Sequence, residues 1–534
     1  MPSLLWHTVR PTCAVIIMNE FSLRLIYSAG LSLRVLSTML VVASGLVLVM
    51  ALSSAFNTQP EKWFGHPDEY LHRSAARYYL DHWLPPKVGD PATMDSYSRE
   101  YGLSYLNEPD IVYFLAGKFA ALLSPILPHP DHAFRLFNVF LFSILALSCA
   151  GRAKESLVFL PIVLSPQIWY LFSYFNGDAF PLFVSILIAY QLAVPSSAFN
   201  RWMMSGQVRT YLWGAILLGT LIGLLILSKK NYYSFLAVVP AVLAFRLFGI
   251  AAGIFTSLLL LLAIGVHLGR ETNLLSFSPT TLFSAAVGIM TFMLVTIFAN
   301  PDSRRHRAAI LLKLVVVGGI AALVAAPRMI VDDLQHGSLR NKDAMVREMS
   351  EQLARSEYKP SKIYAGDPGG YYGSALRAKE LKFKDIFRPP WEWHIKTFQS
   401  ATGNYGWLEF RAPGIYYRVV GLAYLALFGY LAWRIARSGD RGLQALSLAV
   451  TGFSVILIAI AAYFSWTRDF QAQGRYLFPV LGMLSLILQS AKRYVSEPIC
   501  MGMAAFCFLL SCYSFVFVGL AEIPKSGFFK TIFH

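Results

Sequence analysis

Charged residues are scarce in this chain: Asp, Glu, Lys and Arg make up 14% of its 534 residues, whereas hydrophobic residues make up 56%. A soluble protein of this length needs more polar surface, and the mean hydropathy of +0.51 agrees with that reading. The apolar residues gather in runs long enough to cross a bilayer as helices, since about 20 residues suffice. The sequence therefore predicts an all-α polytopic membrane protein.

Cysteines are few, and the common nucleotide and hydrolase motifs are missing. The five cysteines lie in or beside apolar runs, so no disulfide framework is predicted. The chain has no Walker-type loop, no Gly-x-Ser-x-Gly and no dinucleotide fingerprint, which leaves ATP-driven transport without support. The histidines lack the spacing of a zinc site. No cofactor is expected; a divalent metal is compatible with the carboxylates, but nothing in their spacing indicates one.

The net charge of +16 reflects basic residues in short loops between apolar runs rather than a nucleic-acid surface. Placing these loops in the cytoplasm gives about thirteen transmembrane helices, with the apolar run 109–127 lying in the outer interface instead of crossing. No cleavable signal peptide is evident. The predicted spans are 35–55, 133–150, 157–174, 179–195, 211–228, 233–249, 250–268, 279–299, 309–327, 415–434, 443–465, 476–490 and 498–520.

This topology brings the large polar loops together on the outer side of the membrane. The first of these loops should hold two interfacial helices, of which the first runs from Asp68 to about Trp83 with an amphipathic pattern. The later loop is helix-prone at its start, then glycine-rich, then aromatic. The predicted units are a cytoplasmic segment 1–34, a transmembrane module 35–327 with the outer loop 56–132, an outer cap loop 328–413, and C-terminal transmembrane helices 414–534.

Two adjacent carboxylates, Asp68 and Glu69, open the first outer loop directly after the first span. Charge at a membrane edge is costly to keep without a use for it. Partial desolvation raises the pKa of a carboxylate, which suits it to act as a general base. Asp68 and Glu69 are therefore the candidate catalytic residues. The alternative is a helix cap, in which an acidic residue meets the positive end of the helix dipole, and the two roles are compatible.

Basic residues that could hold a phosphate come from later segments. Arg475 offers a guanidinium that can contact two phosphate oxygens, and Gly474 would let the backbone approach a ligand. The alternative for Arg475 is an interfacial ion pair with Asp469. Lys229 and Lys230 lie outside, against the orientation rule, and either a phosphate or lipid headgroups would compensate them.

The remaining candidate binding residues are polar or aromatic groups near these charges. Asp178 could orient a substrate, ligate a metal or cap a helix. The predicted topology places all of the candidate binding residues on the outer side of the membrane. The full set of predicted substrate- and phosphate-binding residues is Lys229, Lys230, Tyr232, Arg475, Tyr476, His66, His72, Arg73 and Asp178.

The order of these features resembles a known enzyme architecture. A first span, an acidic pair, two interfacial helices, a bundle of about thirteen spans and a late outer loop are similar to the GT-C fold. C-class glycosyltransferases of this fold, such as the protein mannosyltransferases and the aminoarabinose transferase of lipid A, use polyprenyl-phosphate sugars. Several motifs also resemble a bacterial family of predicted membrane proteins, domain of unknown function 2142. These motifs are His66-Pro67-Asp68-Glu69, Ser228-Lys229-Lys230, Tyr405-Gly406-Trp407-Leu408 and Gln473-Gly474-Arg475-Tyr476-Leu477-Phe478-Pro479.

The chain departs from many of these relatives at one place, where Asn107-Glu108-Pro109-Asp110 stands in the position of a Pro-Pro-Leu-Tyr motif. The resemblance implies an inverting transfer of a sugar from a polyprenyl-phosphate donor to an envelope glycan, lipid or protein acceptor. It implies a bacterial inner membrane with the site on its periplasmic side. Asp68, with Glu69 second, would deprotonate the acceptor hydroxyl. Lys229 or Lys230, together with Arg475, would bind the leaving phosphate.

Other functions remain open. A transporter or flippase for an envelope precursor would have charged or broken helices near the midplane and inverted repeats, which the sequence does not show. A polymerase or ligase of O-antigen type would lack an acidic pair just after the first span. A non-catalytic membrane scaffold would tolerate the substitution Asp68→Asn.

Overall fold

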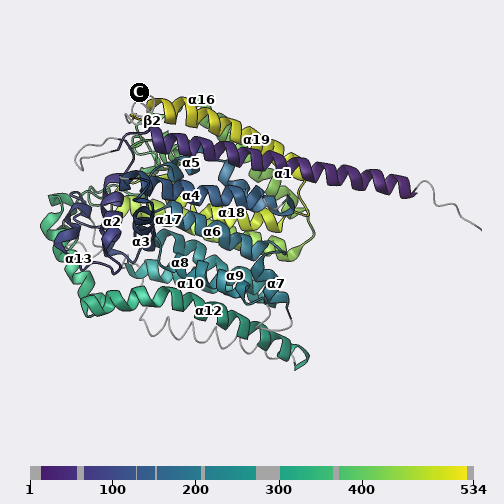
Figure 1. The fold of residues 1–534 in the computed structure, drawn as a ribbon, viewed down its shortest axis with the longest axis horizontal. Coiled ribbons are helices and arrows are strands. Elements are labelled where there is room, and N and C mark those ends of the chain that lie inside the picture. The colour runs from purple at the N-terminus through teal and green to yellow at the C-terminus, as the bar shows by residue number, and fades with distance from the viewer. Residues whose placement is uncertain are drawn as a thin grey trace, which may run out of the picture.

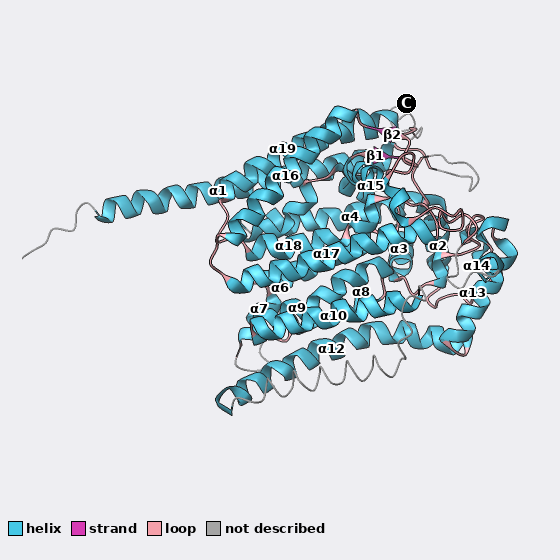
Figure 2. Ribbon diagram, turned by 180° about the vertical axis from the view of Figure 1, so that it is seen from behind, coloured by secondary structure: helices cyan, strands magenta, loops and turns pink. Residues whose placement is uncertain are grey.

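The computed structural model describes residues 14–56, 65–127, 129–150, 153–205, 211–271, 301–364 and 372–525. Over these residues the long helices lie side by side, and shorter helices and loops gather at one end of them (Figure 1, Figure 2). The α-helices are α1 Ala14–Ser53, α2 Glu69–Asp81, α3 Ile111–Leu123, α4 Pro130–Ala150, α5 Pro166–Ser173, α6 Ala179–Ala193, α7 Ala198–Met204, α8 Trp213–Ile226, α9 Tyr233–Phe248, α10 Ile250–Glu271, α12 Pro301–His336, α13 Leu339–Leu353, α14 Pro360–Tyr364, α15 Trp393–Thr402, α16 Gly414–Ala436, α17 Arg441–Thr467, α18 Pro479–Ser490 and α19 Glu497–Ser514.

Short helical turns and one small sheet complete the described fold. The two strands, β1 Asn404–Tyr405 and β2 Phe410–Arg411, pair antiparallel with Asn404 opposite Arg411. The turns are the 3-10 helices η1 Pro91–Ser96, η2 Tyr105–Asn107, η3 Ala153–Val163, η4 Lys230–Tyr232, η5 Ser356–Tyr358, η6 Phe383–Phe387 and η7 Gly474–Leu477, and the π-helical turn η8 Phe515–Leu520.

Eight of the described helical stretches are long and apolar enough to cross a membrane, which confirms the all-α polytopic class. Four further apolar helices are shorter, namely α3, α8, α18 and the Ile250–Gly265 part of α10. The predicted span 279–299 lies outside the described residues. The eight long stretches are Arg34–Ser53, Pro130–Ala150, Ala179–Met204, Lys230–Phe248, Arg307–His336, Gly414–Ala436, Arg441–Thr467 and Glu497–Leu520.

The predicted span 157–174 is not one continuous helix, so that prediction is wrong. The 3-10 helix η3 contains Pro161, and α5 starts anew behind Ser165, whose hydroxyl accepts a hydrogen bond from the N–H of Gln167. Proline lacks an N–H and its ring clashes with the preceding turn, so an α-helix does not continue through it. The whole stretch is nevertheless buried among the other helices.

The two helices predicted for the first outer loop are present as α2 and α3. Gly117 of α3 allows them to approach closely, since a Cβ there would lie 2.6 Å from the Cβ of Tyr79. Lys118, the charge inside this apolar run, donates from Nζ to the Leu80 carbonyl at 3.3 Å and lies 4.3 Å from the centre of the Trp83 ring. With 13 residues α3 is about 20 Å long, shorter than a hydrocarbon core of about 30 Å.

The cap packs directly on the first outer loop. The preceding helix, α12, extends past the predicted boundary of the cap and ends at His336. Ser350 of α13 donates from Oγ to the carbonyl of Tyr101 at 2.7 Å. Gly102, at φ 60°, makes room for this contact, because a Cβ there would lie 2.8 Å from the Cα of Ser350. Both views place α2, α3 and α13 at the same end of the bundle (Figure 1, Figure 2).

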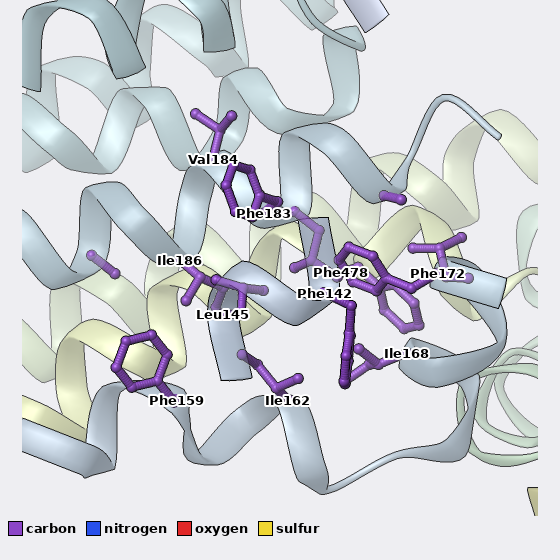
Figure 3. Packing of buried hydrophobic residues seen from close by; sticks show 14 of the residues in the cluster. Phe142, Leu145, Phe159, Ile162, Ile168, Phe172, Phe183, Val184, Ile186 and Phe478 are labelled. Carbon is purple, nitrogen blue, oxygen red and sulfur yellow. The ribbon is translucent and has the colours of Figure 1, made fainter. Parts of the chain in front are cut away.

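A continuous apolar core holds α18 and the turn η7 before it in place. Figure 3 shows Phe142 of α4, Phe183 of α6 and Phe478 in the same part of this core. Between helices in a bilayer, such side chains stabilise the fold through close van der Waals packing rather than through removal from water. Gly482 lets α18 approach α9, since a Cβ there would lie 2.9 Å from the ring of Phe235. The segment that carries the predicted arginine therefore starts from a rigid support.

Candidate functional site

A cavity of about 710 Å³ lies where the cap meets the first outer loop. Its walls come from the start of α2, the loop before α3, α5, the cap and the segment around η7. It thus joins residues from the beginning and the end of the chain. Among the lining residues are Asp68, Tyr105, Tyr174, Arg475 and Tyr476.

Asp68 and Arg475 meet directly in this cavity. Nη2 of Arg475 donates to Oδ2 of Asp68 at 2.8 Å, although 407 positions separate them in sequence. The Arg475 side chain is 9% exposed and that of Asp68 is 22% exposed. Nε and Nη1 of Arg475 are buried and donate to no group among the described residues. Leaving such donors unpaired costs about 1–3 kcal/mol each, so an anionic ligand with several oxygens fits this guanidinium.

The backbone of Asp68 is strained. Its φ of 58° and ψ of 1° lie in the left-handed region, which costs a residue with a Cβ roughly 1–3 kcal/mol. Asp68 occupies the N-cap position of α2, yet its side chain makes no capping hydrogen bond. The carboxylate faces the cavity instead. Of the two roles predicted for Asp68, its contacts match the one in the cavity.

Glu69 turns the other way and is fully buried. Its Oε1 and Oε2 accept from Nε and Nη2 of Arg135, each at 2.7 Å, and Oε1 also accepts from the N–H of Phe175 at 3.1 Å. Burial favours the neutral acid, but the charge and hydrogen bonds of Arg135 outweigh it and lower the pKa of Glu69 to about 2. Glu69 is therefore an ionised anchor for α2. Arg135 also donates to the carbonyl of Ser54 at the end of α1.

His66 stabilises the loop before α2 through buried contacts with neighbouring segments. Its Nε2 bonds Ser54 Oγ at 2.7 Å, its Nδ1 bonds the Tyr170 hydroxyl at 3.0 Å, and its ring stacks on Tyr174 at 4.7 Å. Burial, assisted by the positive charge of Arg135, lowers the pKa of His66 to about 3 despite the nearby carboxylate of Glu69. His66 is therefore neutral at pH 7 and acts as a brace.

Lys229 belongs to a second polar cluster beside the cavity. Its Nζ lies 2.9 Å from Oδ2 of Asp178, and Tyr232 donates to the Asp178 carbonyl at 3.3 Å. A Cβ at Gly177 would lie 2.8 Å from Cε of Lys229 and 3.5 Å from Oδ2 of Asp110, so these two side chains lie against the same glycine. Burial raises the pKa of Asp110 to about 7, although Lys229 opposes the shift. The ammonium of Lys229 is thus already paired with the carboxylate of Asp178.

The other predicted residues lie around these two groups. Asp178 occupies the N-cap position of α6 without a side-chain capping bond. Lys230 is exposed and pairs with Glu108 at 2.8 Å. His72 lies between the clusters, where Nδ1 bonds the hydroxyl of Tyr113 at 2.8 Å. Its ring stacks on the cavity residue Tyr105 at 4.0 Å.

Arg73 is directed away from the cavity and pairs with Asp131. Gly474 does allow a close approach, but to α15, because a Cβ there would lie 2.4 Å from the Cβ of Ala401. The alternative pair of Arg475 with Asp469 does not form among the described residues. Asp469 accepts from the Tyr101 hydroxyl instead.

Sequence reasoning missed two groups of site residues. Arg135 left a readable signal, since a charge inside an apolar helix needs a partner. The contacts of Tyr101 and Gln471 left none, because nothing in their local sequence indicates that they meet. Tyr476 was predicted as a binding residue, and it lines the cavity and donates to Gln471.

Fold and site together define a multi-pass helical membrane protein with a polar, arginine-containing cavity at one end of its bundle. A family model described as predicted membrane protein (DUF2142) matches residues 365–484, which include Arg475. The predicted resemblance to that family is confirmed over these residues. No curated protein matches the chain.

Among solved structures, the chain is similar to the crystal structure of ArnT from Cupriavidus metallidurans bound to undecaprenyl phosphate. The identity is 12% and the TM-score is 0.41, with 92% of this chain and 67% of that chain covered. A likeness at this TM-score is too loose to carry residue roles from one chain to the other. The roles of the cavity residues are therefore inferred from their own contacts.

Proposed function

We propose that this protein is an inverting glycosyltransferase that moves a sugar from a polyprenyl-phosphate donor to an envelope glycan, lipid or protein acceptor. The observation that supports it most is the contact of Asp68 with Arg475 inside the cavity. A base for the acceptor and a cation for the leaving phosphate must lie within one substrate of each other. The polyprenyl-phosphate class of the donor rests on the motif resemblance.

The proposed step uses one carboxylate and one guanidinium. The acceptor oxygen forms a bond to the anomeric carbon while the bond from that carbon to the phosphate oxygen breaks. The acceptor proton goes to Asp68, and the electron pair of the broken bond goes to the phosphate, which leaves as polyprenyl phosphate. Arg475 stabilises the charge that builds on this phosphate in the transition state. No general acid is needed, because the phosphate leaves as an anion.

The contacts favour Arg475 over the two lysines as the phosphate ligand. Lys229 is paired with Asp178, so a dianionic phosphate there would meet this carboxylate. Lys230 points to the exposed Glu108. Glu69, His66 and Arg73 are better suited to hold α2 than to touch the substrate. We place the site on the periplasmic side of a bacterial inner membrane, as the distribution of basic loops predicts.

The proposal is tested with purified protein and a panel of labelled polyprenyl-phosphate sugars, with envelope extract as acceptor. We expect transfer by the wild type and its loss in Asp68→Asn. Arg475→Ala should also weaken the binding of polyprenyl phosphate alone, which is measured without turnover. Arg340→Ala, an exposed arginine of α13, serves as the matched control. Transfer at full rate by Asp68→Asn would show that the base is elsewhere.

A further inference from the structure

A polar network covers the cavity wall next to Arg475 and takes part in none of the steps above. Tyr476 donates from its hydroxyl to Oε1 of Gln471 at 2.5 Å. Nε2 of Gln471 donates to the Tyr101 hydroxyl at 3.1 Å and to Oδ2 of Asp469 at 3.0 Å. The Tyr101 hydroxyl donates to the same oxygen at 2.6 Å. All four side chains line the cavity.

The direction of these bonds decides what the network can bind. Both hydroxyl protons are used inside the network, and one amide proton of Gln471 is shared between the Tyr101 hydroxyl and Oδ2 of Asp469, which lie 2.6 Å apart. Oδ1 of Asp469 receives no hydrogen bond from the residues that the structure describes, and Asp469 is half-buried. The capacity that is left consists mostly of acceptor lone pairs, among them those of Oδ1 of Asp469, with the second amide proton of Gln471 as one donor. A ligand at this wall therefore meets a carboxylate and mainly acceptors, which favours hydroxyl or amino groups over the oxygens of a carboxylate or phosphate.

The surroundings of the network combine aromatic rings with charges of both signs. Glu100, a second carboxylate of the lining, lies 3.8 Å from Arg355, which lines the cavity as Arg99 does. The Tyr101 ring packs edge-on against Tyr358 at 4.8 Å, and both rings line the cavity. Aromatic rings beside carboxylates and amides suit the mixed apolar and hydroxylated faces of a sugar. An anionic substituent placed on the network would meet the carboxylate of Asp469, whereas the charge of Glu100 is offset by Arg355.

The network begins beside the residue that we assign to the phosphate. Tyr476 follows Arg475 in the chain, and the guanidinium carbon of Arg475 lies 5.5 Å from the centre of the Tyr476 ring. In a lipid-phosphate donor, the group attached to the phosphate is the sugar to be transferred. A donor phosphate on Arg475 would therefore bring that sugar to the network.

We infer that Tyr101, Asp469, Gln471 and Tyr476 form the subsite that recognises the transferred sugar. The subsite selects a sugar with free hydroxyl or amino groups and disfavours one with a carboxylate or an added phosphate. This inference rests on the proposed function. Asp469 is its specificity-determining residue, because it holds the free acceptor oxygen.

The test compares polyprenyl-phosphate hexose with the matching polyprenyl-phosphate uronic acid and with polyprenyl phosphate alone. In Asp469→Asn we expect the affinity and kcat/KM for the hexose to fall roughly 10- to 100-fold, the range for a hydrogen bond to a charged group. The relative preference for the uronic acid should rise. Binding of polyprenyl phosphate alone should not change. An amino-sugar donor that loses more than the hexose would identify amino groups as the preferred donors.

Asp343→Asn, an exposed carboxylate of α13 outside the lining, is the matched control and should behave as wild type. Tyr101→Phe keeps the ring and the Asp469 charge, so we expect a smaller loss for the hexose, and the thermal midpoint of each variant reports its folding. Equal weakening of sugar-bearing and sugar-free lipid, or no change for the hexose, would overturn the subsite. Selective loss of hexose binding without any turnover by the wild type would support the subsite and contradict the proposed transfer.

Discussion

Asp68 and Glu69 are neighbours in sequence, and each carboxylate pairs with one arginine, but the two pairs differ in what surrounds them. The Glu69–Arg135 pair is sealed, with side chains 0% and 1% exposed, and both oxygens of Glu69 have partners. The Asp68–Arg475 pair has one hydrogen bond, a partly exposed carboxylate and guanidinium donors without partners. The first pair supports the fold, and the second is ready for a ligand.

This comparison shows why a buried ion pair is not by itself a functional site. Desolvation of two charges is offset only when the geometry is good and other hydrogen bonds satisfy the remaining donors and acceptors. Arg135 meets that condition through Glu69 and the backbone at the end of α1. Arg475 does not, and unsatisfied buried donors of this kind need an explanation such as a ligand.

The largest effect is expected from Asp68→Asn. The amide keeps the shape of the side chain but cannot take a proton, so transfer should fall about 10²–10⁴-fold, the usual contribution of a general base. Stability should fall less than in Arg135→Ala, because the amide oxygen can still accept from Arg475 and Asp68 makes no capping bond. Initial rates and the thermal midpoint in detergent check both parts. A variant that retains its rate but melts early would reverse the roles assigned to the two carboxylates.

The next effect is on folding. Arg135→Ala leaves Glu69 as a buried charge without its partner, so we expect a loss of about 3–5 kcal/mol in the free energy of unfolding. Arg77→Ala is the matched control, because Arg77 also pairs with a carboxylate but is 46% exposed, and surface pairs contribute about 0–1 kcal/mol. Reversible denaturation of both variants gives the comparison. Equal losses would mean that burial of the Arg135 pair has no special weight.

As the pH falls, protonation of His66 should destabilise the region around the Glu69–Arg135 pair before protonation of Glu69 does. The pKa of His66 falls from its usual 6.5 to about 3 on folding, so the unfolded chain binds a proton that the folded chain rejects. Stability from this group is present above pH 6.5 and is lost as the pH falls towards 3, by at most about 1.4 kcal/mol per pH unit. Glu69 adds a loss only below about pH 4.5. Thermal midpoints from pH 7 to 4 should show the decline, and His66→Gln should flatten it.

The smallest expected effect has the opposite sign and concerns the cluster of Lys229, Asp178 and Asp110. Folding raises the pKa of Asp110 from 3.8 to about 7, so its contribution is present below pH 3.8 and is lost as the pH rises through 7. Asp110→Asn should therefore be more stable relative to wild type at pH 8 than at pH 5. Melting curves at the two pH values measure this. A constant difference would show that Asp110 is ionised in both conditions.

Local patterns were sufficient for some elements and not for others. The short apolar run around Lys118 correctly indicated a helix, because length and hydropathy are local properties, and its place at the membrane interface stays a prediction. Pro161 was visible in the sequence, but hydropathy alone predicted one span where the structure has two pieces. Gly474 indicated that another group approaches the backbone closely, but the sequence did not reveal that this group is Ala401. The partner of Lys229, Asp178, comes from another segment, so the sequence around Lys229 could not reveal this pair, and the phosphate role of Lys229 stays a prediction.

The low charge and the long apolar runs by themselves determined that this chain is a helical membrane protein, since the bilayer requires those properties of each segment separately. The acidic pair and Arg475 could be recognised in the same way as costly groups at a membrane edge. Which carboxylate faces the cavity was decided only by the tertiary structure. The left-handed turn at Asp68 and the clamp from Arg135 send neighbouring side chains in opposite directions, and contacts across 407 residues depend on the packing of the whole bundle.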